Sequence, residues 1–532
     1  MGRLLRNPVF LLAFAAGLIA FAAQSGDTGT SDTAHRLQTA HSFWTSTPPV
    51  YPNEYPEFGV HGRNGSIQSW FGIGQSLLLL PADVVGTYLE RLPAFANYNG
   101  NDPGVRTIVV TYSVSMFLNI MTALVCFRFL RHLNFGTKYS IAGTLALLLM
   151  TTHLHYTQNL QENNYIFLLT LTGLLYQLKW LRTGKTRALI AGSAAFGLNL
   201  LTRITTGMDL LAGGLFILLV LWFENIGRAE FMRRCRQYIA GALPVYLFFL
   251  LLDRLYQFYR FGSFTNTYIG LVTAETKARV PGLPASYPWT TPFETGFFGA
   301  LFSPEKSIFL FDPLLILMLA LALVAWPRFS ATVKAYTVTM ALLLLGYLSF
   351  YARYFAWAGD DAWGDRYVST TVELAALLAV PLLLRFHRQL RHWTWGFGLA
   401  LMAVSLLVQM ASLAFWMPLE LYQMETLGRP TFVIGLRFEN IVAFAMGKMG
   451  AWGLMNKPMT QDPWDFVHIT SWNFLPFQLA RGGEAPQSVV NLALVLWDTS
   501  LFLLVGVLWR LRKVLKRLIY SGSREIRPEV MS

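Results

Sequence analysis

The feature that most constrains this chain is a series of apolar runs that suit a bilayer better than a soluble core. Phe397–Trp416 contains no charged residue, and Val489–Leu508 contains only Asp498. A helix of about 20 residues crosses the roughly 30 Å hydrocarbon core of a bilayer, because each residue adds about 1.5 Å. Charged residues make up 13% of the chain, about half of what a water-facing surface needs. The sequence therefore predicts an integral membrane protein.

The predicted fold is an all-α polytopic membrane protein, a single membrane domain over residues 1–532 with extended outer loops. About twelve transmembrane helices are predicted, at 8–24, 107–127, 139–153, 164–178, 188–203, 208–223, 238–256, 308–326, 335–351, 368–384, 395–415 and 489–509. Residues 1–25 also have the basic start and apolar stretch of a signal peptide. We expect an uncleaved first span, because the residues that follow look functional and need a local anchor.

The charges between the spans predict the orientation. About 25 of the 42 lysines and arginines lie in seven short segments, together with only four acidic residues, Glu224, Glu230, Glu525 and Glu529. Cytoplasmic loops carry such an excess of basic residues. The predicted inner segments are the N-terminus, 128–138, 179–187, 224–236, 327–334, 385–391 and the tail 510–532. Both termini are therefore predicted to be cytoplasmic, in a multi-pass protein of the cell's inner, cytoplasmic membrane.

Two other classes of protein are disfavoured by the same counts. The net charge of +13 comes from topology signals rather than from a basic face, so no nucleic-acid partner is expected. The chain has two cysteines, Cys126 in a predicted span and Cys235 on the predicted inner side, which excludes a disulfide framework.

The long loops lie on the predicted outer face. They are 25–106, 257–307, the acidic and aromatic 352–367, and 416–488, which we expect to lie on the bilayer. Transporters usually have short loops and place polar residues at mid-membrane. Here the predicted spans are mostly free of charge, Asp498 being the main exception. This distribution favours an enzyme of the cell envelope working at the membrane surface over a transporter or flippase.

Acidic residues at the outer span ends are candidate catalytic groups. Asp27 and Asp32 follow span 1, and Asp32 shares a helix face with Arg36 if the segment is helical. Helix capping by Ser31 or Asp32 is the alternative. Glu162, between spans 3 and 4, is expected to pair with Asp32. Such a pair holds a divalent cation, Mg or Mn, or divides the roles of base and orienting group.

Basic residues at the predicted outer face are candidate ligands for an anion, and aromatic and acidic residues there are candidate ligands for a sugar. Arg254, Arg260 and Lys306 sit where the positive-inside rule disfavours cations, so they suit phosphate binding, although snorkelling is the alternative. Polar and aromatic residues suited to sugar recognition, or to an interfacial belt, are His155, Trp363, Asp365, Arg366 and Tyr367. Gln75 follows Gly72-Ile73-Gly74, which resembles a phosphate-cradling turn but also suits a re-entrant or interfacial helix.

These segments together resemble the GT-C superfamily of membrane glycosyltransferases, close to the polyprenyl-phosphate-sugar-dependent group labelled glycosyltransferase 39 or RgtA/B/C/D-like. The resemblance runs through most of the chain. It rests on the acidic, arginine-containing first outer loop and on four motifs in order, Gly72–Ser76, Tyr259–Ser263, Phe302–Ser307 and Trp363–Tyr367.

The resemblance implies a hexosyl- or pentosyltransferase that moves a sugar, with inversion, from a polyprenyl-phosphate donor to a hydroxyl of a glycan, lipid or protein. Asp32 looks like the general base, with Asp27 as the other candidate, and Glu162 like a second acid. Phosphate binding falls to Arg36, Arg254, Arg260, Lys306 and Arg366. A divalent cation on Asp32 and Glu162 is a further expectation. The function predicted from the sequence is therefore membrane glycosyl transfer at the outer face.

Overall fold

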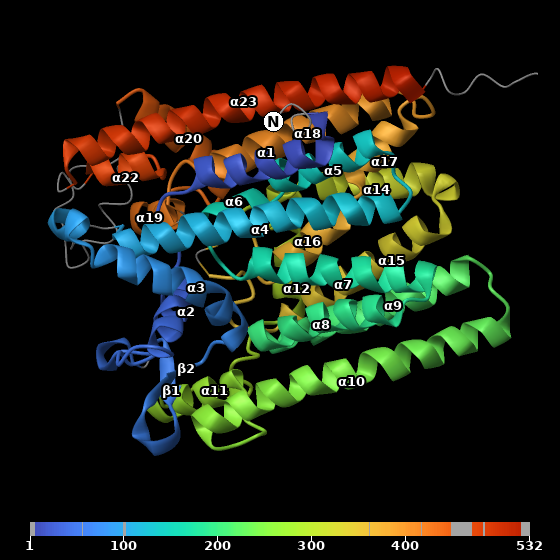
Figure 1. The fold of residues 1–532 in the computed structure, drawn as a ribbon. Coiled ribbons are helices and arrows are strands. Elements are labelled where there is room, and N and C mark those ends of the chain that lie inside the picture. The colour runs from blue at the N-terminus through green and yellow to red at the C-terminus, as the bar shows by residue number, and fades with distance from the viewer. Residues whose placement is uncertain are drawn as a thin grey trace, which may run out of the picture.

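The computed structural model describes residues 6–55, 57–98, 103–360, 362–416, 418–447, 471–481 and 485–522. These residues form a bundle of long helices that lie roughly side by side (Figure 1). A helix covers most of each predicted span, namely α1 (Pro8–Ala23), α4 (Val105–His132), α5 (Thr137–Met150), α7 (Asn163–Thr183), α8 (Thr186–Thr202), α9 (Gly207–Phe223), α10 (Arg228–Phe261), α14 (Leu314–Ala325), α15 (Ala331–Tyr351), α16 with α17 (Ser369–Ala376, Ala379–Phe386), α18 (His392–Ser412) and α23 (Gln487–Gly522). The predicted all-α fold is confirmed.

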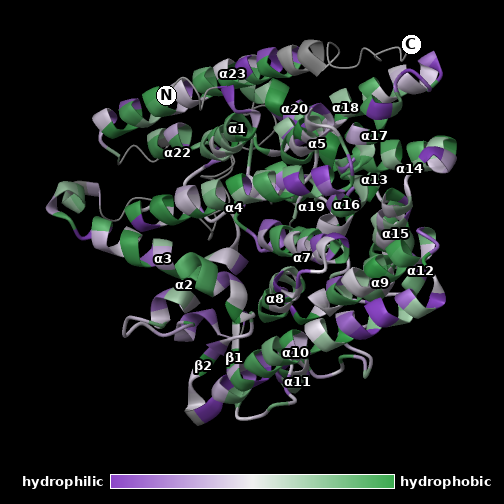
Figure 2. Cartoon of the chain, turned by 45° about the vertical axis from the view of Figure 1, so that its right-hand side comes forward, coloured by the Kyte–Doolittle hydropathy of each residue, from purple (hydrophilic) through white to green (hydrophobic). Residues whose placement is uncertain are grey.

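The surface of the bundle has the apolar character of a membrane protein. Seven helices of the described chain are long and apolar enough to cross a membrane, and α1, α5 and the stretch Leu314–Arg328 are shorter apolar helices. Large apolar side chains such as Leu211, Leu323 and Phe502 are exposed on the outside of these helices, and Figure 2 shows hydrophobic ribbon along most of their length. Lipid chains would cover such a surface. The number of spans, twelve, stays a prediction.

Local sequence signals explain where the long helices begin and end. The Asn7 side chain accepts the backbone N–H of Val9 (2.9 Å), and Pro8 occupies the first helical position, where its missing N–H costs nothing. α10 has 34 residues and ends at Gly262, which adopts the left-handed conformation (φ 69°). At 1.5 Å per residue α10 is about 50 Å long. This helix is therefore longer than a roughly 30 Å hydrocarbon core is thick.

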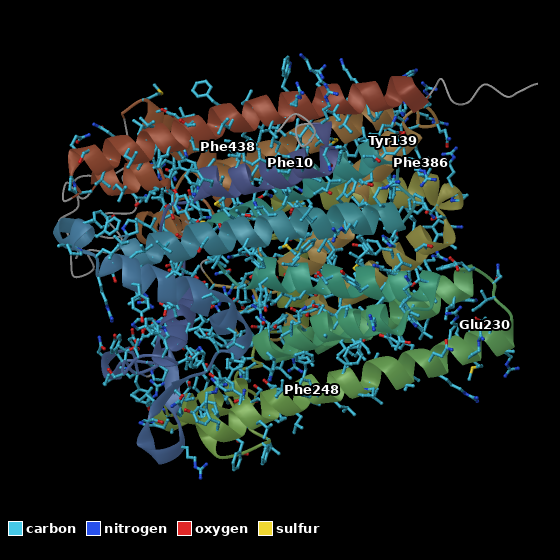
Figure 3. The ribbon with its side chains drawn as sticks, viewed as in Figure 1. Phe10, Tyr139, Glu230, Phe248, Phe386 and Phe438 are labelled. Carbon is cyan, nitrogen blue, oxygen red and sulfur yellow. The ribbon has the colours of Figure 1, made fainter. Side chains whose placement is uncertain are left out.

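The outer segments gather at one end of the bundle, at the left of Figure 1. They comprise α2 (Ser31–Ser42), the strands β1 (Gly59–His61) and β2 (Ile67–Ser69), α3 (Ile73–Glu90) and α11 (Tyr268–Arg279). The two strands are antiparallel, with Val60 opposite Gln68. Tyr139, Glu230 and Phe386, which lie in or beside predicted inner segments, are at the opposite end (Figure 3). The two predicted faces of the membrane thus correspond to the two ends of the bundle.

The predicted outer loop 416–488 is largely helical where the structure describes it. It contains α19 (Pro418–Leu427), α20 (Val433–Ala445) and α22 (Leu475–Arg481), while residues 448–470 lie outside the described part. The fully buried Arg437 of α20 pairs with Glu420 of α19 and donates to the carbonyl groups of Ser412 and Phe415 (both 3.0 Å). This segment is therefore packed onto the end of α18.

The expectation that Asp498 is the main charged residue within the spans is wrong for five further spans. Arg203 ends span 188–203, Asp253 and Arg254 lie near the end of span 238–256, and three more spans each contain one buried acid. Asp209, Asp312 and Glu373 lie inside the predicted spans 208–223, 308–326 and 368–384, and all three are buried against polar partners. A single acid in an apolar run is easily overlooked, because it barely lowers the mean hydropathy of a span. Only the packing shows that these acids face the interior of the bundle and not a loop.

The arrangement predicts which cysteines are accessible from each side. Ser66 is exposed next to the turn between the two strands, at the outer end. In intact cells, we expect a membrane-impermeant maleimide to label the Ser66→Cys variant but not the native protein. The native Cys235 should be labelled only after permeabilisation, because it lies in the first turns of α10, within the predicted inner segment 224–236. Labelling of the native protein in intact cells would contradict the predicted orientation and indicate that Cys235 lies on the outer side.

Candidate active site

A cavity of about 810 Å³ lies at the end of the bundle where the predicted outer segments gather. Its walls come from α2, from the segment between α6 (His153–Gln158) and α7, and from the α8–α9 junction. The outer end of α10, α11 and the segment after α15 complete the walls. Seven of the thirteen residues singled out in the sequence line it: Asp32, Arg36, His155, Glu162, Arg254, Arg366 and Tyr367. Residues from six distant parts of the sequence therefore meet in one place.

The first turn of α2 directs Asp32 into this cavity. Thr30 is the N-cap, its hydroxyl accepting the backbone N–H of Thr33 (3.3 Å), so neither Ser31 nor Asp32 caps the helix. The Asp32 carboxylate is therefore free to face the cavity, and Arg36 lies on the same side one turn later. The carboxylate also lies in the first turn, where the helix dipole favours a negative charge.

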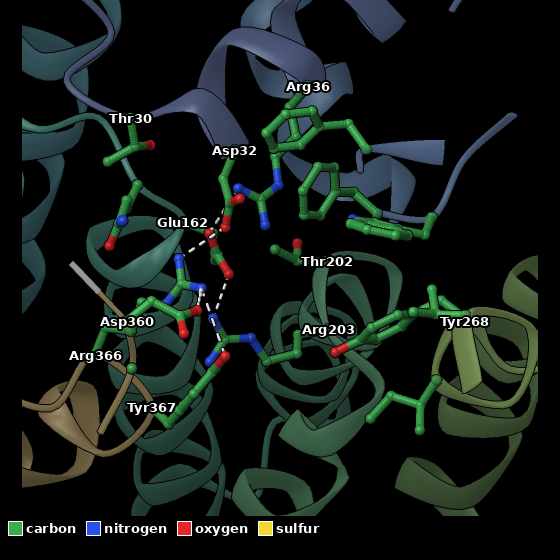
Figure 4. A pocket seen from close by; sticks show the side chains of 18 of the residues that line it. Thr30, Asp32, Arg36, Glu162, Thr202, Arg203, Tyr268, Asp360, Arg366 and Tyr367 are labelled. Carbon is green, nitrogen blue, oxygen red and sulfur yellow. Dashed lines mark hydrogen bonds and ion pairs between the residues drawn. The ribbon is translucent and has the colours of Figure 1, made fainter. Parts of the chain in front are cut away.

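Glu162 lies at the centre of the charged network (Figure 4). Its carboxylate pairs with Arg36 (2.9 Å) and with Arg203, and its side chain is only 5% exposed. Burial by itself would raise the pKa of Glu162. The charges of Arg36, Arg203 and Arg366 outweigh burial and hold that pKa well below the ordinary 4.5. Glu162 is therefore ionised at neutral pH and is a weak proton acceptor, so its contacts make it a positioning group for two arginines.

Arg366 connects Asp32 to the acidic outer segment. One guanidinium nitrogen donates to Asp32 (2.8 Å) and another to Asp360 (2.9 Å). The Tyr367 ring lies below two guanidinium groups, those of Arg366 (5.2 Å) and Arg203 (5.7 Å). The Asp32 side chain is 20% exposed, and Arg366 is its one ion-pair partner in the described chain. Asp32 is thus more accessible than the 5% exposed Glu162 and more enclosed than the 55% exposed Asp360.

The glycines of Gly72-Ile73-Gly74 pack backbone against backbone and do not form a phosphate-cradling turn. A Cβ atom on Gly72 would lie 2.4 Å from the carbonyl oxygens of Leu201 and Thr202, and one on Gly74 would clash with the Thr202 side chain. Helix α3 begins at Ile73, so these residues open a helix, which agrees with the interfacial-helix alternative. The close approach seats the end of α8 against α3, which brings the next residue, Arg203, into the cavity.

Arg203 is the functional residue that sequence reasoning missed. It closes a predicted span, where an arginine is easily taken for a snorkelling side chain. The signal was present in the sequence, since a cation at the outer end of a span runs against the positive-inside rule. Asp360 and Tyr268 also line the cavity. They belong to outer segments that the sequence marks, Asp360 to the acidic and aromatic 352–367 and Tyr268 to 257–307. Tyr268 belongs to α11, which faces the arginine network from the far side (Figure 4).

Aromatic side chains form much of the remaining wall. The Phe71 ring lies 4.1 Å from the Arg36 guanidinium carbon, and Tyr354 packs edge-on against Tyr367 (5.8 Å). Trp70 and Phe355 also line the cavity. Flat apolar rings beside charged and hydrogen-bonding groups suit the faces and hydroxyl groups of a sugar.

His155 reaches the same wall as a neutral side chain. Burial, reinforced by the charge of Arg437, lowers the pKa of His155 to about 3. Its ring stacks near Trp363 (6.0 Å) and its Nε2 lies 2.7 Å from the Asn159 side-chain nitrogen. A direct contact between His155 and a sugar stays a prediction. The neutral ring offers a hydrogen bond there and no charge.

Two predicted phosphate ligands serve the backbone instead. The buried Arg260 donates to the carbonyls of Ser69 and Phe71, and so holds the segment between β2 and α3. Lys306 donates to the carbonyls of Asp360 (2.6 Å) and Ala362 (2.8 Å), and so holds the acidic segment that leads to Arg366. Neither lines the cavity. Sequence spacing could not distinguish these buried backbone contacts from phosphate contacts.

Arg254 does line the cavity, but its guanidinium pairs with the neighbouring Asp253 and donates to the Asn266 carbonyl (2.9 Å). Arg254 therefore ties the outer end of α10 to the segment that leads into α11. Its predicted contact with a phosphate would require it to give up part of this pairing.

Four further predicted residues lie outside the cavity. Trp363 is fully buried, 5.0 Å from the Phe311 ring. Asp365 accepts the Tyr367 N–H (3.0 Å), and burial raises its pKa to about 7. Asp27 accepts the Gly29 N–H (2.9 Å), and Gln75 donates to a backbone carbonyl (2.7 Å). These contacts shape the segments that form the site, and they do not support the predicted sugar contacts or a base role for Asp27.

The charges around Glu162 do not fit a divalent cation. Both Glu162 oxygens already face guanidinium groups, and Asp32 faces Arg366. Mg²⁺ or Mn²⁺ between the two acids would lie beside three arginine cations, which repel it. Among the described residues, no group of three or more His, Cys, Asp and Glu side chains is placed to hold a metal. The arrangement suits an anion, since a guanidinium paired with one carboxylate still has N–H groups to offer.

No protein-family model matches the sequence, and no curated protein matches it. Two solved structures are similar in fold. The crystal structure of the Archaeoglobus fulgidus oligosaccharyltransferase, tethered with an acceptor peptide, is 14% identical with a TM-score of 0.46. The match covers 76% of this chain and 55% of that one. ArnT from Cupriavidus metallidurans bound to undecaprenyl phosphate is 13% identical with a TM-score of 0.42, covering 98% and 80%.

The central position of Glu162 predicts a large effect on stability. Replacing it by glutamine leaves Arg36 and Arg203 buried without a counter-charge. Removing one partner of a buried ion pair costs about 3–5 kcal/mol. We expect Glu162→Gln to lower the thermal midpoint strongly in detergent. The matched control is Glu224→Gln, whose pair with Arg182 is half-exposed at the other end and contributes about 0–1 kcal/mol.

The same pair predicts a pH dependence. Because the folded-state pKa of Glu162 is lowered, its stabilisation is present above the ordinary value of 4.5 and is lost as the pH falls toward the folded-state pKa. The difference in stability between wild type and Glu162→Gln should therefore shrink from about pH 7 to about pH 3. A difference that stays constant over this range would contradict the assigned pairing.

Proposed function

We propose that the protein is a membrane glycosyltransferase that moves a sugar from a polyprenyl-phosphate donor to an acceptor hydroxyl at the outer face of the membrane. The observation that carries the proposal is the meeting of a partly exposed acid, Asp32, with the arginines Arg36, Arg203 and Arg366 in one cavity. A displacement at the anomeric carbon needs both a base for the acceptor and cations for the departing phosphate.

The proposed reaction is a single displacement. The Asp32 carboxylate takes the proton of the acceptor hydroxyl while the hydroxyl oxygen attacks the anomeric carbon. The bond from that carbon to the phosphate oxygen breaks, and the phosphate leaves with the electron pair on its polyprenyl chain. Attack opposite to the leaving group inverts the anomeric centre. Asp32 then releases its proton to water at the mouth of the cavity.

The ion pairs of the cavity give each arginine a role in this step. Arg366 donates to the Asp32 carboxylate and so orients it before substrate binds. Glu162 keeps the guanidinium groups of Arg36 and Arg203 next to each other. Phosphate oxygens would take the remaining N–H groups, because guanidinium forks match phosphate geometry. The location suits such a donor, since a lipid phosphate needs no nucleotide as leaving group and reaches the site from the bilayer.

A transporter or flippase of lipid-linked glycans is the second candidate. One observation favours it: the acids Asp209, Asp312 and Glu373 lie buried within the helix bundle, where transporters place functional charges. Against it, the described cavity lies at the outer end and its charged residues come from loops and helix ends. We therefore favour the transferase.

Transfer of labelled sugar in proteoliposomes tests the base. With polyprenyl-phosphate sugar donors and a panel of glycan, lipid and protein acceptors, Asp32→Asn should lose about 10²–10⁴-fold in transfer rate, the usual contribution of a positioned base. Donor binding should be retained. The matched control is Asp360→Asn, which removes the other acid bonded to Arg366 and should leave most of the transfer rate.

Unchanged transfer in Asp32→Asn would refute Asp32 as the base. If the wild type moves lipid-linked sugar across the bilayer and transfers none to any acceptor, the transporter explanation replaces the enzyme.

Arg203 is expected to act on the donor phosphate. Removing a hydrogen bond to a charged group costs about 1.5–3 kcal/mol, so Arg203→Gln should raise the Kd for a polyprenyl phosphate roughly 10- to 150-fold. Titration calorimetry in detergent measures this directly. Arg182→Gln, at the opposite end of the bundle, serves as the control. An unchanged Kd in a folded Arg203→Gln protein would remove Arg203 from the phosphate site.

A further inference from the structure

A second group of ionisable side chains lies inside the bundle and is not used by the proposed reaction. It consists of His153 at the start of α6, Asp312 between α13 (Ile308–Phe311) and α14, and Glu373 on α16. Thr152 and Asn119 join them. All five are fully buried and none lines the outer cavity. Ionisable groups within the membrane region are costly unless they have partners, so their protonation needs an explanation.

The hydrogen atoms around His153 can be counted from its neighbours. The Asn119 amide nitrogen donates to the Ala16 carbonyl (3.4 Å), which turns the Asn119 oxygen toward His153 Nε2 (3.0 Å). Nε2 must then carry a hydrogen, and a neutral imidazole has a bare lone pair at Nδ1. The nearest acidic oxygen is Glu373 Oε2, 3.5 Å from Nδ1. Both atoms are buried and neither has a hydrogen-bond partner.

Two bare lone pairs facing each other in a dry interior are strongly unfavourable. A proton between His153 Nδ1 and Glu373 Oε2 removes the conflict. It does so either as a carboxylic acid donating to the imidazole or as an imidazolium beside a carboxylate. In both forms the contact holds one proton more than neutral histidine and ionised glutamate together.

The remaining contacts of Glu373 lead to a second acid. The Thr152 hydroxyl lies 3.0 Å from Asp312 and 3.1 Å from Glu373, and the Thr152 backbone N–H donates to Asp312 (2.8 Å). A hydroxyl group has a single hydrogen, so it satisfies only one of the two acids at a time. No ion pair within the described chain joins Asp312 or Glu373 to a lysine or arginine. Two uncompensated negative charges would therefore share this interior.

We propose that His153, Glu373 and Asp312 form a proton-binding site inside the helix bundle that holds one proton at neutral pH. The other groups that face the site are the Asn119 amide of α4, the Phe167 ring of α7 (5.6 Å from His153) and the titratable Tyr156 of α6. None of these supplies a positive charge. The proton is thus the ligand that makes the cluster tolerable in a low-dielectric interior.

The proton-binding site makes the stability of the fold depend on pH, in a direction that can be predicted. The folded chain holds a proton that the unfolded chain keeps on its histidine at mildly acidic pH and releases above the ordinary histidine pKa of about 6.5. Stability therefore falls as the pH rises above about 6.5, by up to about tenfold in the unfolding equilibrium per pH unit. Glu373→Gln imitates the protonated acid, because its amide donates to His153 Nδ1 and its oxygen still accepts from Thr152. This variant should fold and should lose that dependence.

Infrared difference spectroscopy and ¹⁵N NMR of histidine in the purified full-length protein locate the proton. We expect either the carbonyl band of a protonated carboxyl at about pH 7, lost or shifted in Glu373→Gln or Asp312→Asn, or an imidazolium signal from His153. Asp209→Asn is the matched control. It removes a buried acid that two hydroxyl groups, those of Thr170 (2.9 Å) and Tyr347 (3.1 Å), already contact, and it should leave the signal in place.

Three outcomes would overturn the proposal. A neutral His153 with no protonated carboxyl would mean that no proton is held. A band lost only in Asp209→Asn would belong to the other buried acid. Thermal stability that follows the sodium concentration, with potassium as the comparison, and not the pH would assign the cluster to a metal cation.

Discussion

A carboxylate held between two guanidinium groups joins the parts of the chain that form the cavity. Glu162 precedes α7, Arg36 belongs to α2, and Arg203 ends α8. In a buried setting each of these charges is tolerable only beside its partners. The outer segment, the middle of the chain and the α8–α9 junction are therefore held together by the same three side chains. Because Glu162 is fully engaged, Asp32 is left with Arg366 and a path to the cavity.

The position of this network also decides what chemistry the site can perform. The bundle presents apolar side chains outward, and the polar residues of the cavity gather where the helices end. A lipid-linked donor could bring its phosphate to the arginines from the bilayer while a hydrophilic acceptor enters from water. Excluding bulk water strengthens each charge interaction at such a boundary. The backbone contacts of Arg260 and Lys306 keep the segments around the cavity in place.

The buried acids show a different use of charge in the same bundle. Around Glu162 arginines compensate a carboxylate, whereas around Glu373 no arginine or lysine of the described chain is paired. The first arrangement suits a site that must bind and release an anion. The second suits a site that only needs to stay neutral, because a proton is small enough to be held between His153 and Glu373 without opening the packing.

The sequence by itself determined the helices and the membrane, because apolar run length is a local property, and from loop charge it predicts that the chemistry lies at the outer face. It also identified Asp32 with Arg36, whose spacing of four residues is local, and Arg366 with Tyr367. Only the tertiary structure decided which partner each charge takes. Arg203 enters the site because two glycines let α3 touch the end of α8, while Arg260 is withdrawn to backbone carbonyls. Those outcomes depend on contacts between residues far apart in the chain, which spacing along a sequence cannot express.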